Sequence, residues 1–281
     1  MDVKSAIKFM LISTLAFACM NAIVKFLTDV SPFQIVFFRS GSSLFFTFGF
    51  LLKNKISIIG TNNKLLILRG LVGVTSMTLF FMSIKYLSVG TAVSLRYIAP
   101  IFAAIFAVIL LKEKIKIVQW LFFLMAFIGV IILKGFDTKL NTYGLFLVLL
   151  AAVFSGLVYI IISKIGKSEH PVVVVNYFMV IATIVGGILS IKNWVNPNGY
   201  EWLLLFSLGF FGYFGQVYMT KAFQTASTSQ VAPFKYIEVI FTVLFGIFVF
   251  KEIYTFWSVI GIALIIGGLI LNVLYKARYN S

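Results

Sequence analysis

The chain has 281 residues, of which 61% are hydrophobic and only 11% charged, and its mean hydropathy is +1.08. Because soluble domains carry about 25% charged residues, this composition excludes a soluble globular protein and indicates a polytopic membrane protein in a lipid bilayer. The formal charge of +15 does not indicate a nucleic-acid partner, because the basic residues lie mainly in short links between apolar runs.

Ten apolar runs follow one another along the chain, each close to the roughly 20 residues that cross a bilayer as a helix. They are continuous rather than alternating, which favours helices over the strands of a barrel. We therefore expect an all-α membrane protein with ten transmembrane helices. The runs cover residues 6–27, 33–52, 65–86, 91–111, 117–133, 144–163, 172–191, 202–221, 229–250 and 255–274.

The basic residues predict the orientation of these helices. With the N-terminus inside, most cations fall on the cytoplasmic side, so both termini are expected to be cytoplasmic. Frequent Ile, Lys, Phe and Asn are typical of AT-rich bacterial genomes, and we expect a bacterial inner (cytoplasmic) membrane. The predicted cytoplasmic cations are Lys4, Lys8, Lys53, Lys55, Lys64, Arg69, Lys112, Lys114, Lys116, Lys164, Lys167, Lys221, Lys276 and Arg278.

The two halves of the chain match each other at a shift of 139 positions, the separation of Glu113 from Glu252. The same shift, without a gap, relates many other identical pairs, which indicates a duplicated unit. These pairs are Lys25 and Lys164, Pro32 and Pro171, Gly70 and Gly209, Gly73 and Gly212, Tyr97 and Tyr236, Lys112 and Lys251, and Gly129 and Gly268.

Five spans per copy is an odd number, so the second copy must enter the membrane from the opposite side. We therefore predict two inverted five-helix repeats, residues 1–134 and 143–281. This is the architecture of many alternating-access carriers, whose substrate site lies near the midplane between the halves.

Charges within an apolar run are the strongest candidates for a functional site. Lys235 and Glu238 lie three residues apart, so on a helix they share a face and can pair. Pro233 precedes them and is predicted to break the helix, freeing carbonyl groups toward a cavity. The alternative is that Lys235 extends its amino group to the membrane interface.

Arg96 is the repeat counterpart of Lys235, and Pro100, four residues later, is a second predicted helix break. A cation in each half could meet the same anionic group as the carrier opens to either side, and Arg can hold a carboxylate or phosphate by two hydrogen bonds. Arg39 lies about 9 Å inside the second run. Lining of the site and structural pairing are equally open for Arg39, whereas Asn21 and Lys25 are interpreted as structural.

Other chemistries lack their residues in this sequence. His170 is the single histidine and Cys19 the single cysteine, so no zinc centre and no Cys/His catalytic cluster can form. No phosphate-binding GxxxxGK[ST] motif occurs. We expect no catalytic residues, no metal and no cofactor, and hence no enzyme.

The segments LRYIAPIFAAIFAVILLKEK and APFKYIEVIFTVLFGIFVFKE close the two repeats. Together with the two five-span repeats, they resemble the paired EamA-type domains of the drug/metabolite transporter superfamily. The resemblance implies that helices 1, 3, 4, 6, 8 and 9 line a central cavity. It places the substrate near five residues: Arg96, Tyr97, Lys235, Tyr236 and Glu238. Ala99 stands where the repeat would put a second Glu238, so a symmetric acidic pair is not expected.

These observations predict a secondary transporter for a small anionic or zwitterionic organic metabolite, and the resemblance implies the amino acid, S-adenosylmethionine or riboflavin class. A coupled proton or exchanged metabolite is one expected partner, and the protein is expected to be a monomer or homodimer. One alternative is an efflux carrier for lipophilic cations, with Glu238 as acceptor. Another is a membrane subunit that scaffolds a partner and transports nothing.

Overall fold

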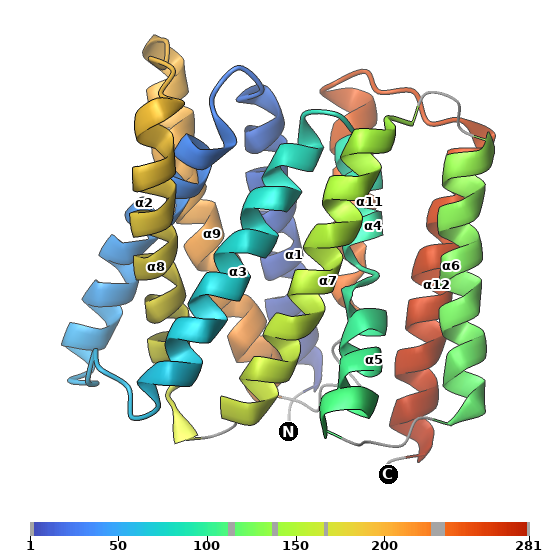
Figure 1. The fold of residues 1–281 in the computed structure, drawn as a ribbon, viewed down its shortest axis with the longest axis horizontal. Coiled ribbons are helices and arrows are strands. Elements are labelled where there is room, and N and C mark those ends of the chain that lie inside the picture. The colour runs from blue at the N-terminus through green and yellow to red at the C-terminus, as the bar shows by residue number, and fades with distance from the viewer. Residues whose placement is uncertain (1–2, 112–115, 137–139, 166–167, 226–233, 280–281) are drawn as a thin grey trace.

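The computed structural model describes residues 3–111, 116–136, 140–165, 168–225 and 234–279, which form helices and connecting loops without a strand (Figure 1). The helices are α1 (Val3–Phe26), α2 (Pro32–Lys53), α3 (Asn63–Ile84), α4 (Val89–Arg96), α5 (Ala99–Leu111), α6 (Ile117–Phe136), α7 (Thr142–Ile165), α8 (Pro171–Lys192), α9 (Gly199–Thr225), α11 (Ile237–Phe248) and α12 (Phe256–Tyr279).

Eight segments of the described chain are long and apolar enough to cross a membrane, with α4 and α5 together forming one of them. Two further apolar helices, residues 117–132 of α6 and the whole of α11, are shorter. The prediction of a helical protein with many apolar spans is confirmed for the described residues. Large apolar side chains such as Phe45, Phe248 and Ile253 are exposed, as a lipid-facing surface requires.

Local sequence signals explain where several helices begin. α2 and α8 each start with a proline, which fits the first turn because its missing N–H has no helical partner there. Asn62 and Ser88 precede α3 and α4, and their side chains accept hydrogen bonds from the amides of Leu65 and Thr91.

The fourth predicted run is divided in the structure. α4 ends at Arg96, a turn follows at Tyr97 and Ile98, and α5 begins at Ala99 with Pro100 in its first turn. Proline is tolerated in that position, so the break comes just before Pro100. The second half has a matching turn at Tyr236 before α11. The predicted break at Pro233 lies outside the described residues.

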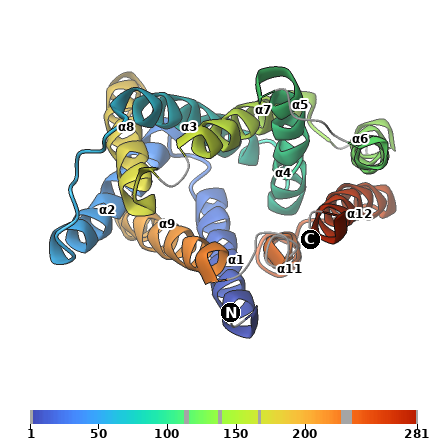
Figure 2. The same cartoon turned by 90° about the horizontal axis from the view of Figure 1, so that it is seen from below.

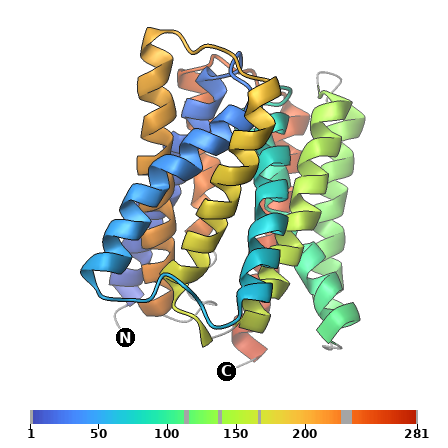
Figure 3. The same ribbon diagram turned by 60° about the vertical axis from the view of Figure 1, so that its left-hand side comes forward.

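Helices distant in the sequence pack side by side. α1 packs on α9, α3 on α7, α2 on α8, α4 on α11 and α6 on α12. Figures 1 and 2 show α2 and α8 at one edge of the bundle and α6 with α12 at the opposite edge. Figure 3 turns the first edge forward and shows α2 and α8 side by side. Both chain ends lie at the same end of the molecule (Figure 1).

Glycines permit several of these close contacts. A Cβ on Gly73 would lie 3.1 Å from the Phe178 ring, and one on Gly212 would lie 3.4 Å from Nε of Arg39. Gly129 is likewise close to the carbonyl of Gly261, and Gly268 to the carbonyl of Phe122. Such close approach of backbones is typical of helix packing in membranes.

Candidate functional site

Glu238 is buried near the start of α11 and is bound by two side chains from the first half of the chain. Its Oε2 accepts a hydrogen bond from the Tyr97 hydroxyl at 2.6 Å, and its Oε1 accepts one from Nδ2 of Asn21 at 3.0 Å. We call these three residues the Glu238 cluster. It joins α1, the turn after α4, and α11.

The two helix breaks meet beside this cluster. The rings of Tyr97 and Tyr236 contact each other edge to face, with their centroids 5.2 Å apart. The Tyr97 hydroxyl also lies 3.2 Å from the carbonyl oxygen of Lys235. The amino group of Lys235 lies 5.6 Å from the centroid of the Tyr97 ring, within the range of a cation–π interaction.

The structure does not show the predicted pairing of Lys235 with Glu238. The i, i+3 argument assumed a continuous helix, whereas the turn at Tyr236 separates the two residues. Among the described residues, the ion pair found within 4.0 Å is between Lys25 and Glu252 instead.

The side chains of Arg96 and Arg39 contact different residues. The guanidinium carbon of Arg96 lies 4.3 Å from the centroid of the Phe80 ring on α3. Arg39 is only 3% exposed, and its Nη1 lies 2.9 Å from the sulfur of Met77 and 3.8 Å from that of Met179. The structure thus places Arg39 within the protein, as its depth required.

Arg69 joins Arg39 at one aromatic ring. Their guanidinium carbons lie 4.2 Å and 5.7 Å, respectively, from the centroid of Phe178. Arg69 is 7% exposed, and within the described part of the chain its Nε and Nη1 have no hydrogen-bond partner, nor does Nε of Arg39. We call Arg39 and Arg69 the arginine pair.

Sequence reasoning did not single out Arg69 or Asn21 as a candidate site residue. Arg69 was grouped with the cytoplasmic links, although it lies six residues, or about 9 Å, inside α3. Asn21 was interpreted as structural. The signal for both was the same as for Arg39, a polar side chain at depth within an apolar run.

A cavity of about 120 Å³ lies between α2, α8 and α9. Ser43 and Met179 line it, and both also contact Arg39: the Ser43 hydroxyl donates to the Arg39 carbonyl oxygen, and the Met179 sulfur faces Nη1. The other side of the cavity is lined by Phe50, near the end of α2, and by Pro171, at the start of α8. Both positions lie at the end of the molecule that carries the two termini. The cavity therefore extends from that end toward Arg39.

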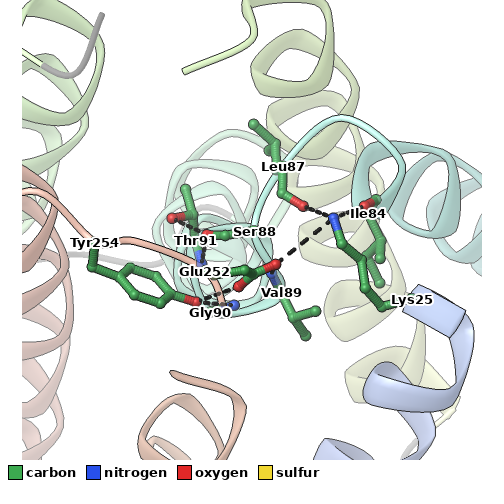
Figure 4. Close-up of polar contacts among 9 residues, drawn as sticks. All are labelled: Lys25, Ile84, Leu87, Ser88, Val89, Gly90, Thr91, Glu252 and Tyr254. Atoms are coloured by element: carbon green, nitrogen blue, oxygen red, sulfur yellow. Dashed lines mark hydrogen bonds and ion pairs between the residues drawn. The ribbon is translucent and has the colours of Figure 1, made fainter. Parts of the chain in front are cut away.

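A second polar cluster (Figure 4) lies where α1 ends and α4 begins, at the end of the bundle opposite the chain termini (Figure 1). Nζ of Lys25 donates to the carbonyl oxygens of Ile84 and Leu87 at 3.0 and 2.8 Å, and lies 3.7 Å from Oε1 of Glu252. The hydroxyl of Tyr254 donates to Oε2 of Glu252 at 2.8 Å. We call Lys25, Glu252 and Tyr254 the Lys25 cluster.

This cluster also holds the start of α4. The amide of Val89 donates to Oε1 of Glu252 at 3.3 Å, and the amide of Gly90 donates to the Tyr254 hydroxyl at 3.3 Å. Burial raises the pKa of Tyr254 well above its usual range, so the hydroxyl keeps its proton and donates to the carboxylate. The Lys25 cluster thus ties the end of α1 and the segment after α11 to the α3–α4 connection.

A metal centre finds no support in the described ranges, because no three His, Cys, Asp or Glu side chains gather there. The polar groups that do gather are carboxylate, hydroxyl, amide and guanidinium. Their chemistry is that of recognising an organic ion by hydrogen bonds and charge.

Comparison with known proteins bears on both halves of the chain. The EamA-like transporter family matches residues 4–134 and again residues 142–274. A crystal structure of another protein superposes with a TM-score of 0.67, covering 99% of this chain and 97% of that chain. The two are 18% identical, so this similarity concerns the fold.

Three relatives illustrate the range of names in this group. The pseudopaline exporter CntI of Pseudomonas aeruginosa is 29% identical over 96% of this chain and 94% of its own. Human solute carrier family 35 member G1 is 31% identical, over 90% of this chain and 74% of its own. The S-adenosylmethionine uptake transporter of Rickettsia prowazekii is 26% identical, over 88% and 85%.

Both the double family match and the apolar helices agree with a multi-pass membrane protein that transports a small molecule. These names describe transporters rather than enzymes. The chain belongs to the EamA-like transporter family, and it carries the family domain twice.

Proposed function

We propose that this protein is a secondary transporter that moves a small anionic or zwitterionic organic metabolite across the bacterial cytoplasmic membrane by alternating access. The observation that carries the proposal is the Glu238 cluster. A buried carboxylate is held by Asn21 and Tyr97 where two helices break, and Lys235 flanks it. Intramembrane ionisable groups at broken helices are typical of substrate pathways.

Ten spans arranged as two inverted repeats are part of this proposal. Reciprocal contacts support them: Gly73 meets Phe178 while Gly212 meets Arg39, and each residue lies 139 positions from its counterpart in the other pair. The contact of Tyr97 with Tyr236 follows the same rule. Such self-matching contacts are expected where two equivalent units pack about a two-fold axis.

The two ends of the bundle differ in a way that fits alternating access. The Lys25 cluster ties three segments together at the end opposite the termini, whereas the cavity lies at the end that carries them. With both termini cytoplasmic, the tied end faces outward and the cavity faces the cytoplasm. Breaking the Lys25 cluster is then one step in opening the outer side.

The charges favour an anionic or zwitterionic substrate. Arg39, Arg96 and Lys235 outnumber Glu238 among the proposed site residues, and the net positive field attracts carboxylates or phosphates. Amino acids, S-adenosylmethionine and riboflavin remain the substrate classes to test. The names of the relatives include both an exporter and an uptake transporter, so both directions belong in the assay.

One observation favours a second candidate, efflux of lipophilic cations. Glu238 is a buried carboxylate beside the rings of Tyr97 and Tyr236, a combination that can bind an organic cation. This candidate predicts that Glu238→Gln abolishes cation efflux and drug resistance. The metabolite proposal predicts no such resistance in the wild type.

The test combines ligand stabilisation with transport. The purified protein in detergent is screened by thermal unfolding against amino acids, S-adenosylmethionine, riboflavin, organic phosphates and lipophilic cations. A ligand at 100 times its Kd adds about 2.7 kcal/mol. Each compound that stabilises the protein is then measured as a labelled substrate in reconstituted vesicles.

Arg96→Ala and Lys235→Ala are expected to abolish both the stabilisation and the transport while the protein still inserts. Lys192→Ala, at the exposed end of α8, is the matched control and keeps both. Full transport in Arg96→Ala and in Lys235→Ala would contradict the proposed role of these charges.

A further inference from the structure

We infer that Arg39 and Arg69 form an anion-binding subsite, distinct from the Glu238 cluster, that takes a carboxylate or phosphate group. This deepens the proposed function, on which it rests, because it locates the anionic group of the transported molecule. It also adds Arg69, which the sequence patterns did not single out.

The charges of Arg39 and Arg69 have no counter-ion among the described residues. No carboxylate of the described chain lies within 4.0 Å of Arg39 or Arg69. Glu169 and Glu201 accept hydrogen bonds from loop groups, and Glu238 and Glu252 are bound within their own clusters. A buried cation without a partner is strongly unfavourable, so a function must offset its cost.

The groups that surround the arginine pair are poor hydrogen-bond acceptors. Phe178 and two methionine sulfurs contact the guanidinium groups. A thioether is only a weak acceptor, and a ring engages the face of a guanidinium rather than its edge. The in-plane N–H groups at Nε of both residues and at Nη1 of Arg69 remain for another acceptor.

The unused N–H donors of the arginine pair are suited to an anion. The fork of N–H groups on a guanidinium matches the two oxygens of a carboxylate or phosphate. The guanidinium carbons of Arg69 and Arg39 lie 4.2 Å and 5.7 Å from the centroid of the Phe178 ring, so both forks lie in the same region, and the ring neutralises neither charge. An anion bound there would satisfy the donors and the charges together.

An anion could approach the arginine pair through a cavity. The cavity between α2, α8 and α9 is lined by Met179, whose sulfur lies 3.8 Å from Nη1 of Arg39, and by Ser43, whose hydroxyl donates to the backbone carbonyl of Arg39. At about 120 Å³ it has room for several water-sized groups. Thr47 and Gln216 also line it, so its wall is partly polar.

The experiment measures anion-dependent stability of the full-length protein purified in detergent. Thermal unfolding is followed in sodium phosphate and in sodium succinate, each against sodium chloride at the same ionic strength. The wild type is expected to show a saturable rise of its melting midpoint of several degrees with phosphate or succinate. The difference between the two arms shows which anion the subsite prefers.

Arg39→Met and Arg69→Met keep the length of the side chain and remove the charge. Each is expected to abolish the anion response and to raise the melting midpoint without anion, because an uncompensated buried charge has gone. Arg69→Lys keeps the charge but loses the fork, so its apparent anion affinity should fall about tenfold or more. Lys192→Met, at the exposed end of α8, is the control and should respond like the wild type.

A wild type that responds to phosphate and succinate no more than to chloride would overturn the inference. So would an anion response that survives in both methionine variants, or variants that unfold at lower temperature than the wild type, since a structural role predicts that loss. Vesicle transport separates this result from the proposed function. Transport without any anion response would support the proposed function and contradict the subsite. An anion response without transport would support the subsite and contradict the proposed function.

Discussion

The Lys25 cluster and the arginine pair are both charged groups in an apolar bundle, yet their surroundings differ. Lys25 faces two carbonyl oxygens and a carboxylate, and that carboxylate is also bound by Tyr254 and a backbone amide. The arginine pair faces a ring and two sulfurs, and three of its donor nitrogens lack a partner within the described chain.

This difference separates two uses of a buried charge. A network whose donors and acceptors are matched stabilises one arrangement of the helices, and removing any member leaves the others unsatisfied. A group with unused donors contributes little to that arrangement and is suited to a ligand. Removing a buried charge can therefore have opposite effects on stability in the two regions.

The largest expected effect is the loss of Glu252. Glu252→Ala leaves Lys25, Tyr254 and the Val89 amide without their shared acceptor, and is expected to lower the free energy of unfolding by about 3 kcal/mol. Thermal unfolding in detergent measures it. Glu252→Gln keeps an acceptor and should lose less. An alanine variant as stable as the wild type would mean that the cluster does not hold this end together.

Replacement of Arg69 should act in the opposite direction. Arg69→Met removes a buried charge that has no counter-ion among the described residues, so the free energy of unfolding is expected to rise by about 2 kcal/mol. The measurement is chemical denaturation without added phosphate or carboxylate. A decrease of similar size would place Arg69 with the Lys25 cluster as a structural charge.

The Tyr97→Phe variant tests whether the Glu238 cluster stabilises the fold, as the Lys25 cluster does, or has little effect on it, as expected for the arginine pair. Tyr97→Phe removes the 2.6 Å hydrogen bond to Glu238 and keeps the ring contact with Tyr236. A loss of about 1.5 kcal/mol is expected, as for a hydrogen bond to a charged group. Tyr236→Phe is the matched control, because the described hydrogen bonds of Glu238 come from Tyr97 and Asn21 and not from Tyr236. Equal stability of the two variants would contradict a structural hydrogen bond at Glu238.

The smallest effect concerns Glu169, a satisfied carboxylate outside the spans. Hydrogen bonds from Thr61 and Asn62 lower its pKa below the ordinary 4.5. The stability that they add is complete above pH 4.5 and is lost as the pH falls through the lowered pKa. Comparing acid unfolding of the wild type and Glu169→Gln measures it. A variant with the same acid dependence as the wild type would exclude Glu169 as the titrating group.

The sequence was most informative about repetition and depth. The shift of 139 positions paired Tyr97 with Tyr236, and the structure places a turn at each and brings their rings together. Depth alone indicated that Arg39 must be enclosed by protein. Both inferences depend on local position along a helix, which the chain encodes directly.

The contacts themselves could not be predicted in the same way. Asn21 lies 217 positions from Glu238, and nothing in the local pattern of either run indicates that α1 would reach α11 there. Lys25 was interpreted only as structural, and no local pattern indicates that the segment after α11 brings Glu252 to it. Arg69 was grouped with neighbouring lysines because the boundary of the third run is indistinct in the sequence.

One contact has a consequence for how a chain of this kind can arise. Arg39 and Phe178 occupy equivalent positions in the two copies, and the structure places them next to each other. Under the proposed two-fold relation, an assembly of two identical half-length chains would bring together either two arginines, which repel, or two phenylalanines, which carry no charge. Joining both copies in one gene removes this restriction. A fused chain can hold one cation against one ring, an arrangement closed to a symmetric ancestor.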